Sequence, residues 1–127
     1  PTAPSMNGYT SGIAAIKVKG VKRTLPAAPP RRIYVLPDVI QHAPLKLRQA
    51  GFCDVLAKVV SDIDWQCESL LASKSYCGLP ASMMAAVEKS YSAFPEEIGR
   101  GDETAVMGLF HGLLLSGVDQ VESHHAT

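Results

Sequence analysis

The sequence lacks an excess of charge of either sign, long apolar runs and most signature motifs of enzymes. Lys plus Arg equal Asp plus Glu, with 12 of each in 127 residues, so the net charge does not indicate nucleic acid or an acidic membrane as a partner. The longest apolar run, residues 109–115, is far short of the roughly 20 residues that cross a bilayer. No Walker loop, HExxH pair or Ser-His-Asp order is present. We therefore expect neither a nucleic-acid partner nor a membrane.

Cysteine is scarce as well. Cys53, Cys67 and Cys77 are odd in number and form no CxxC pair, which argues against a disulfide scaffold and favours reduced thiols. The N-terminus has no basic segment leading into an apolar run, so it does not read as a signal peptide. These features predict a soluble, cytoplasmic protein. Because the chain opens on Pro1 inside a motif-like loop and closes on the polar residues 123–127, we also expect a piece of a longer polypeptide.

The first third of the chain has the pattern of a loop followed by short strands. Residues 1–12 are rich in turn formers and hydroxyls, and predict an ordered loop. Residues 13–19 and 21–26 predict two strands that turn at Gly20. The lysines and arginines that cluster here are interpreted as a solvent-exposed strand face rather than as a binding surface. Residues 32–36 predict a third strand, which Pro37 ends.

After residue 37 the apolar period becomes helical. Asp38 could cap a short turn to His42, Pro44 suits the first turn of a helix that ends at Gly51, and the next helix is predicted over residues 52–73. Its apolar positions form a stripe that we expect to face the core, with Trp65 as an anchor. Further helices are predicted over residues 81–93 and 102–118, the last apolar nearly all round and therefore buried. The fold class is mainly α with a short β-rich N-terminal part.

Asp54 is the most informative acidic residue. The predicted helix start puts it in a first turn, where a carboxylate can face an adjoining cleft and bind a metal. The alternative is a purely structural role, in which Asp54 only complements the helix macrodipole and stabilises the helix by roughly 0.3–1 kcal/mol. Spacing alone leaves both readings open, and one Asp cannot hold a metal by itself. Cys53 is either a soft ligand, a redox-sensitive thiol or a small buried hydrophobe, and the buried reading is favoured. His111, on the apolar last helix, reads as a core histidine rather than a ligand.

Two segments together resemble the sn-glycerol-1-phosphate dehydrogenases. They are Pro-Thr-Ala-Pro-Ser-Met-Asn-Gly-Tyr-Thr-Ser at residues 1–11, and Gly-Phe-Cys-Asp-Val-Leu-Ala-Lys at residues 51–58 with Asp64-Trp65 following. These enzymes belong to the iron-containing alcohol dehydrogenase, glycerol dehydrogenase and dehydroquinate synthase-like superfamily. The similarity covers most of residues 1–75 and weakens afterwards, where Leu115-Ser116-Gly117 still resembles the family.

The resemblance implies a two-domain oxidoreductase with a Rossmann-like α/β domain and an all-helical metal-binding domain. Residues 1–37 would be the end of the cofactor domain, and residues 38–127 an incomplete helical domain. The resemblance also implies NAD or NADP, one divalent metal (zinc, nickel or iron), a small phosphorylated polyol as substrate, and a homo-oligomer.

The same resemblance supplies the site residues. Asp54 matches the metal-binding Asp, Thr2 and Ser11 match positions that touch the dinucleotide, and Asn7 matches a substrate-side, catalytic position that usually holds Asp. The loss of that charge puts any proton-handling role of Asn7 in doubt. Ser5, in the same hydroxyl-rich loop, is expected to bind the cofactor as well, although such hydroxyls are more often satisfied within their own turns. The expected reaction interconverts dihydroxyacetone phosphate and sn-glycerol 1-phosphate. The alternatives are a glycerol or other polyol dehydrogenase of the same superfamily, and a non-catalytic helical binding module derived from the fold.

Overall fold

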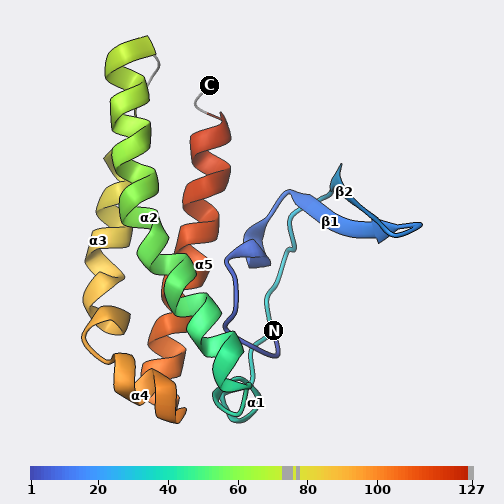
Figure 1. Ribbon diagram of the computed structural model, residues 1–127, viewed down its shortest axis with the longest axis vertical. Coiled ribbons are helices and arrows are strands. Elements are labelled where there is room, and N and C mark those ends of the chain that lie inside the picture. Colours follow the sequence, from blue (N-terminus) through green and yellow to red (C-terminus); the bar gives the residue numbers. More distant parts are fainter. Residues whose placement is uncertain (73–75, 77, 126–127) are drawn as a thin grey trace.

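The computed structural model describes residues 1–72, 76 and 78–125, and its regular secondary structure is helical except for one hairpin (Figure 1). A short 3₁₀ turn η1 (Gly8–Thr10) precedes strands β1 (Ile13–Val18) and β2 (Val21–Pro26). The helices are α1 (Pro37–Gln41), α2 (Leu45–Ala72), α3 (Gly78–Ser92), α4 (Pro95–Arg100) and α5 (Glu103–His125). The mainly α class with an N-terminal hairpin is confirmed. Cys77 and Ser73, which the sequence analysis used, lie outside the described residues.

Helix α5 forms the centre of the helical body. It packs along α3, crosses α2 and contacts α1, α4 and η1. Its buried side chains, Ala105, Val106, Leu109, Phe110 and Leu113, supply half of one apolar cluster of the core and most of the other. The prediction that this helix is buried by its neighbours is confirmed. The helix begins after Asp102, whose Oδ1 accepts a hydrogen bond of 2.9 Å from the Ala105 amide as an N-cap, and it extends beyond the predicted end at residue 118.

The hairpin is confirmed, and its turn has a simple cause. Lys19 (φ 49°) and Gly20 (φ 82°) both have positive φ, as a two-residue type I′ turn requires. The predicted third strand is wrong: in the described part of the chain, residues 32–36 lie outside the two-stranded sheet. The segment is nevertheless partly buried at alternate positions, because Ile33 and Val35 pack against the cluster of Ile40, Val106 and Phe110. They do so from a single extended segment that lies on α1 and α5 without a neighbouring strand in the described part of the chain.

Two of the predicted helix breaks are wrong. Helix α2 continues through Gly51, where a break was predicted, and α4 occupies residues that were predicted to be a break. Gly51 does not end a helix. Its lack of a side chain instead leaves room for the backbone of Pro4, which lies against α2. Helix α4 ends where Gly101 adopts φ 83°, a left-handed C-cap.

The apolar stripe of α2 is not core-facing along its length, and that prediction is wrong for the described residues. Val55 is buried and Phe52 partly buried, but the positions beyond them are exposed: Leu56, Val59, Val60, Ile63, Cys67, Leu70 and Leu71. Trp65 is only half-buried and contacts Tyr76 edge-on, with ring centroids 4.9 Å apart. The second half of α2 extends past the core that α5 provides.

Candidate functional site

The N-terminal loop lies across α2 and α5, and two glycines make this close approach possible. A Cβ at Gly51 of α2 would lie 1.9 Å from the Pro4 carbonyl oxygen. A Cβ at Gly117 of α5 would lie 2.2 Å from the Asn7 carbonyl oxygen and 2.5 Å from Thr10 Oγ1. Any larger residue would displace the loop, so these glycines bring residues 4–10 onto the two helices.

Tyr9 holds this loop in shape. Its hydroxyl donates a hydrogen bond of 2.6 Å to the Ala3 carbonyl oxygen, and its ring packs against Phe110 with centroids 5.2 Å apart. Burial raises the pKa of the Tyr9 phenol, a backbone hydrogen bond from Ser5 opposes that shift, and the negative charge of Asp54 adds to it. Asp54 is therefore close enough to the loop for its charge to be felt there.

Asp54 sits in the middle of a helix rather than at its start. Since α2 begins at Leu45, the predicted first-turn position is wrong, and the macrodipole no longer explains the carboxylate. Asp54 Oδ2 is buried and has no hydrogen-bond partner among the described residues. A buried carboxylate oxygen without a partner is costly. A cation bound at this oxygen would satisfy it, so the residue fits a metal ligand.

The other predicted site residues lie along the same loop, with differing environments. Thr2 is exposed, while Ser5 and Asn7 are partly buried. Ser11 Oγ accepts a hydrogen bond of 3.1 Å from the Ile13 amide, which is the local turn that a hydroxyl-rich loop predicts. Ser5 and Asn7 thus lie on the loop that packs against α2 and α5, and Asp54 lies on α2, where its charge acts on Tyr9 of that loop.

Thr10 is the residue that the sequence analysis missed. Its Oγ1 is buried beside Gly117 and has no hydrogen-bond partner in the described part of the chain. No local signal in Tyr9-Thr10-Ser11 separates this hydroxyl from that of Ser11, because only its burial in the folded chain distinguishes it. Two buried oxygens therefore lack a hydrogen-bond partner among the described residues: Thr10 Oγ1 on the N-terminal loop and Asp54 Oδ2 on α2.

The described residues do not complete a metal site on their own. No group of three His, Cys, Asp or Glu residues that could hold a metal is found among them. His42 ends α1 at the surface, and its Nδ1 lies 2.6 Å from the Asp38 carbonyl oxygen. His111 is exposed, and so is Cys53, so the expectation that each is buried is wrong. Asp54 stays a predicted ligand, with a buried Oδ2 that has no hydrogen-bond partner among the described residues.

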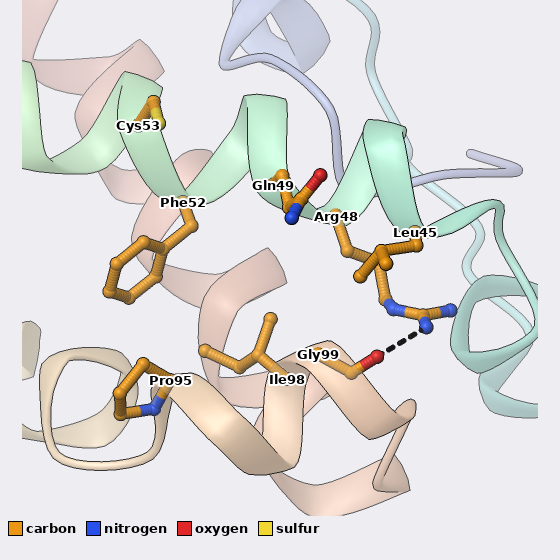
Figure 2. Close-up of a pocket in the computed structure, with 8 residues that line it drawn as sticks. All are labelled: Leu45, Arg48, Gln49, Phe52, Cys53, Pro95, Ile98 and Gly99. Atoms are coloured by element: carbon orange, nitrogen blue, oxygen red, sulfur yellow. Dashed lines mark hydrogen bonds between the residues drawn. The ribbon is translucent and has the colours of Figure 1, made fainter.

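A pocket with a volume of about 410 Å³ lies between α2 and α4, away from the N-terminal loop (Figure 2). Phe52 of α2 faces Pro95 and Ile98 of α4 across it, and Asp54 is not among its lining residues. Arg48 closes one end: its guanidinium donates to the carbonyl oxygens of Gln41 (3.0 Å), Gly99 (2.8 Å) and Ala43. These carbonyls come from the ends of α1 and α4, where the helix dipole favours a cation. Arg48 is therefore a clamp between three helices rather than a free anion-binding group.

Comparison with known proteins agrees with the family resemblance that the two sequence segments indicate. Residues 1–44 match the iron-containing alcohol dehydrogenase family. The chain is 36% identical over 118 residues to a glycerol-1-phosphate dehydrogenase of Geobacillus thermodenitrificans, covering 93% of this chain and 29% of the relative. The resemblance to the glycerol-1-phosphate dehydrogenase family is confirmed.

Other relatives with the same name extend this result. The Bacillus subtilis protein is 32% identical over 126 residues (99% of this chain, 32% of the relative), and the Aeropyrum pernix protein is 32% identical over 118 residues (93% and 34%). The chain spans about a third of the length of the curated relatives that it matches. No solved structure matches. No described helix is long and apolar enough to cross a bilayer.

Proposed function

We propose that this chain supplies a metal ligand and part of the dinucleotide surface of an NAD(P)-dependent dehydrogenase that interconverts dihydroxyacetone phosphate and sn-glycerol 1-phosphate. The single observation that carries the proposal is the buried, unpaired Oδ2 of Asp54 beside the Ser5–Tyr9 loop. The name shared by the relatives, glycerol-1-phosphate dehydrogenase with NAD(P)+, supplies the reaction. As the chain spans only part of those relatives, the activity belongs to the whole protein.

The reaction is a hydride transfer. A bound oxidised nicotinamide would supply the hydride acceptor: sn-glycerol 1-phosphate would lose the hydride of C2 to it and its hydroxyl proton to solvent, which would give dihydroxyacetone phosphate and the reduced cofactor. A divalent metal, zinc, nickel or iron, would act as a Lewis acid on the substrate oxygen. Asp54 would hold that metal from α2, and the substrate hydroxyl would lie nearby.

The loop residues have roles that follow from their positions. Asn7, held over α5 by its contact with Gly117, would orient the substrate by hydrogen bonds and, as a neutral amide, would not take up its proton. Thr2, Ser5 and Ser11 would contact the dinucleotide, and Thr10 adds a buried hydroxyl on the same loop. We keep residues 1–37 and 38–127 as the proposed parts of a cofactor domain and a helical domain, in a cytoplasmic enzyme.

The test is an assay of the protein isolated from its native source. We expect oxidation of NADH or NADPH on addition of dihydroxyacetone phosphate, loss of that activity with a chelator, and a reduction of at least about tenfold in Asp54→Asn. Asp64→Asn makes the same change at an exposed position of α2 and should leave the rate unchanged. Equal rates in both variants would remove Asp54 from the mechanism. Turnover of glycerol instead of the phosphate would identify a polyol dehydrogenase.

A further inference from the structure

The phenol of Tyr9 is partly buried and reaches back to the start of the loop that carries it. Its hydroxyl donates a hydrogen bond of 2.6 Å to the Ala3 carbonyl oxygen, six residues earlier in the chain. The backbone amide of Ser5 hydrogen-bonds to the same phenol. Residues 3–5 therefore form a turn around one hydroxyl group.

Pro4, in the middle of this turn, is the residue that touches α2. It is fully buried, and a Cβ at Gly51 would lie 1.9 Å from its carbonyl oxygen. Asp54 follows Gly51 by three residues, and residues three apart are neighbours on one side of a helix. The turn that the Tyr9 hydroxyl ties together therefore lies about one helical turn from the proposed metal ligand.

The aromatic ring of Tyr9 is held independently of its hydroxyl. The ring packs against both apolar clusters of the core, and its centroid lies 5.2 Å from that of Phe110 on α5. Asn7 and Thr10, its neighbours on the loop, contact α5 at Gly117. A phenylalanine would fill the same place in the core, so the hydrogen bonds to residues 3–5 are the specific contribution of a tyrosine at this position.

We propose that Tyr9 is a positioning residue of the dinucleotide site. Its hydroxyl holds the turn of residues 3–5 against α2, one helical turn from Asp54. Thr2 and Ser5 border this turn and are the proposed contacts to the dinucleotide, so the turn fixes them relative to the metal ligand. Hydride transfer needs the reacting groups at a short, fixed separation, and an error of about 1 Å is costly. This inference rests on the proposed function, because it assigns a role within the same site.

The test compares Tyr9→Phe with wild type in the whole protein, because this chain spans only part of its relatives. NADH binding is followed by the fluorescence of the reduced nicotinamide, and zinc binding by competition with a chromophoric chelator. We expect Tyr9→Phe to weaken NADH binding at least about fivefold, the effect of one lost hydrogen bond, and to leave the zinc affinity within about twofold of wild type. Hydrogen exchange of the Ser5 amide should also become faster.

Two further variants separate positioning from a general loss of structure. Tyr91→Phe removes the hydroxyl of another tyrosine that packs in the core, on α3, and should leave both affinities unchanged. Asp54→Asn should show the opposite division, with weaker zinc binding and unchanged NADH binding. If Tyr9→Phe does not fold by circular dichroism, Gly51→Ala decides, because it displaces Pro4 from α2 and should weaken NADH binding without weakening zinc binding.

The outcomes separate this inference from the proposed function. NADH affinity equal to wild type in folded Tyr9→Phe overturns the positioning role and leaves the proposed function standing. Equal losses of NADH and zinc affinity also overturn it, since they indicate a general disturbance of the fold. A wild-type protein that binds neither NADH nor zinc refutes the proposed function, and the role of Tyr9 is then refuted with it.

Discussion

Replacement of Gly51 by alanine tests whether the N-terminal loop is bound to α2. A Cβ at this position would lie 1.9 Å from the Pro4 carbonyl oxygen, 2.8 Å from the Pro4 carbonyl carbon and 3.0 Å from Leu113 Cδ1. The backbone of Pro4 must retreat by roughly 1.5 Å to reach the ordinary contact distance of 3.4 Å. A backbone group cannot turn aside as a flexible side chain can, so the loop itself must move.

The two opposing contributions differ in size. Alanine in a helix interior is more favourable than glycine by about 0.5–1 kcal/mol. Overpacking costs about 1–3 kcal/mol, and displacement of the loop also endangers the Tyr9–Ala3 hydrogen bond, worth about 1 kcal/mol. We therefore expect Gly51→Ala to lower the free energy of unfolding by about 1–2 kcal/mol in urea titrations. Faster amide exchange over residues 3–10 should accompany the loss.

Gly99→Ala is the matched control for this measurement. Gly99 lies in α4, and a Cβ there would meet no heavy atom within 4 Å. Its substitution should therefore leave the free energy of unfolding unchanged or raise it by up to about 1 kcal/mol. If Gly51→Ala proves as stable as Gly99→Ala, with unchanged exchange over the loop, the packing of the loop on α2 is refuted.

Three further predictions follow from other contacts. Gly117→Ala should release the same loop from α5, because the new Cβ would lie 2.2 Å from the Asn7 carbonyl oxygen, and the gain in exchange over residues 7–10 would show it; protection equal to wild type would argue against this contact. Arg48→Met should lower the free energy of unfolding in urea by at least about 1.5–3 kcal/mol, because three carbonyl oxygens lose a charged donor; a loss below about 0.5 kcal/mol would contradict the clamp. Burial raises the pKa of Tyr9 and of Tyr91 above the usual value of about 10, so their neutral forms stabilise the fold below that pH and the contribution is lost as the pH rises above it. Tyr9→Phe should thus lose stability less steeply than wild type in alkaline titrations followed by circular dichroism, and parallel curves would refute this.

The hairpin and the last helix could be predicted because local chemistry decides them. Gly20 supplies a positive φ between two strand-forming runs, and the apolar residues of α5 are buried whichever neighbour covers them. Residues 32–36 show the limit of this reasoning, since an alternating pattern predicts an extended chain and says nothing about whether another strand is beside it.

The site was only partly predictable for a related reason. Gly51 looks like a helix stop when read locally, and only the tertiary structure shows that it is a point of close approach for Pro4. The correction matters for Asp54, because a residue in mid-helix loses its simplest structural explanation. Thr10 could not be singled out among neighbouring hydroxyls, since burial beside Gly117 is what distinguishes it.

Equilibrium binding of a divalent metal to the protein from its native source tests the central claim most directly. Competition against a chromophoric chelator, with zinc, nickel or ferrous iron in turn, measures the affinity without reference to activity. We expect one metal per chain, with an affinity reduced at least about tenfold in Asp54→Asn and unchanged in Asp64→Asn. Wild-type affinity in Asp54→Asn would show that the buried oxygen of Asp54 is not a metal ligand, and the assignment of this site would be wrong.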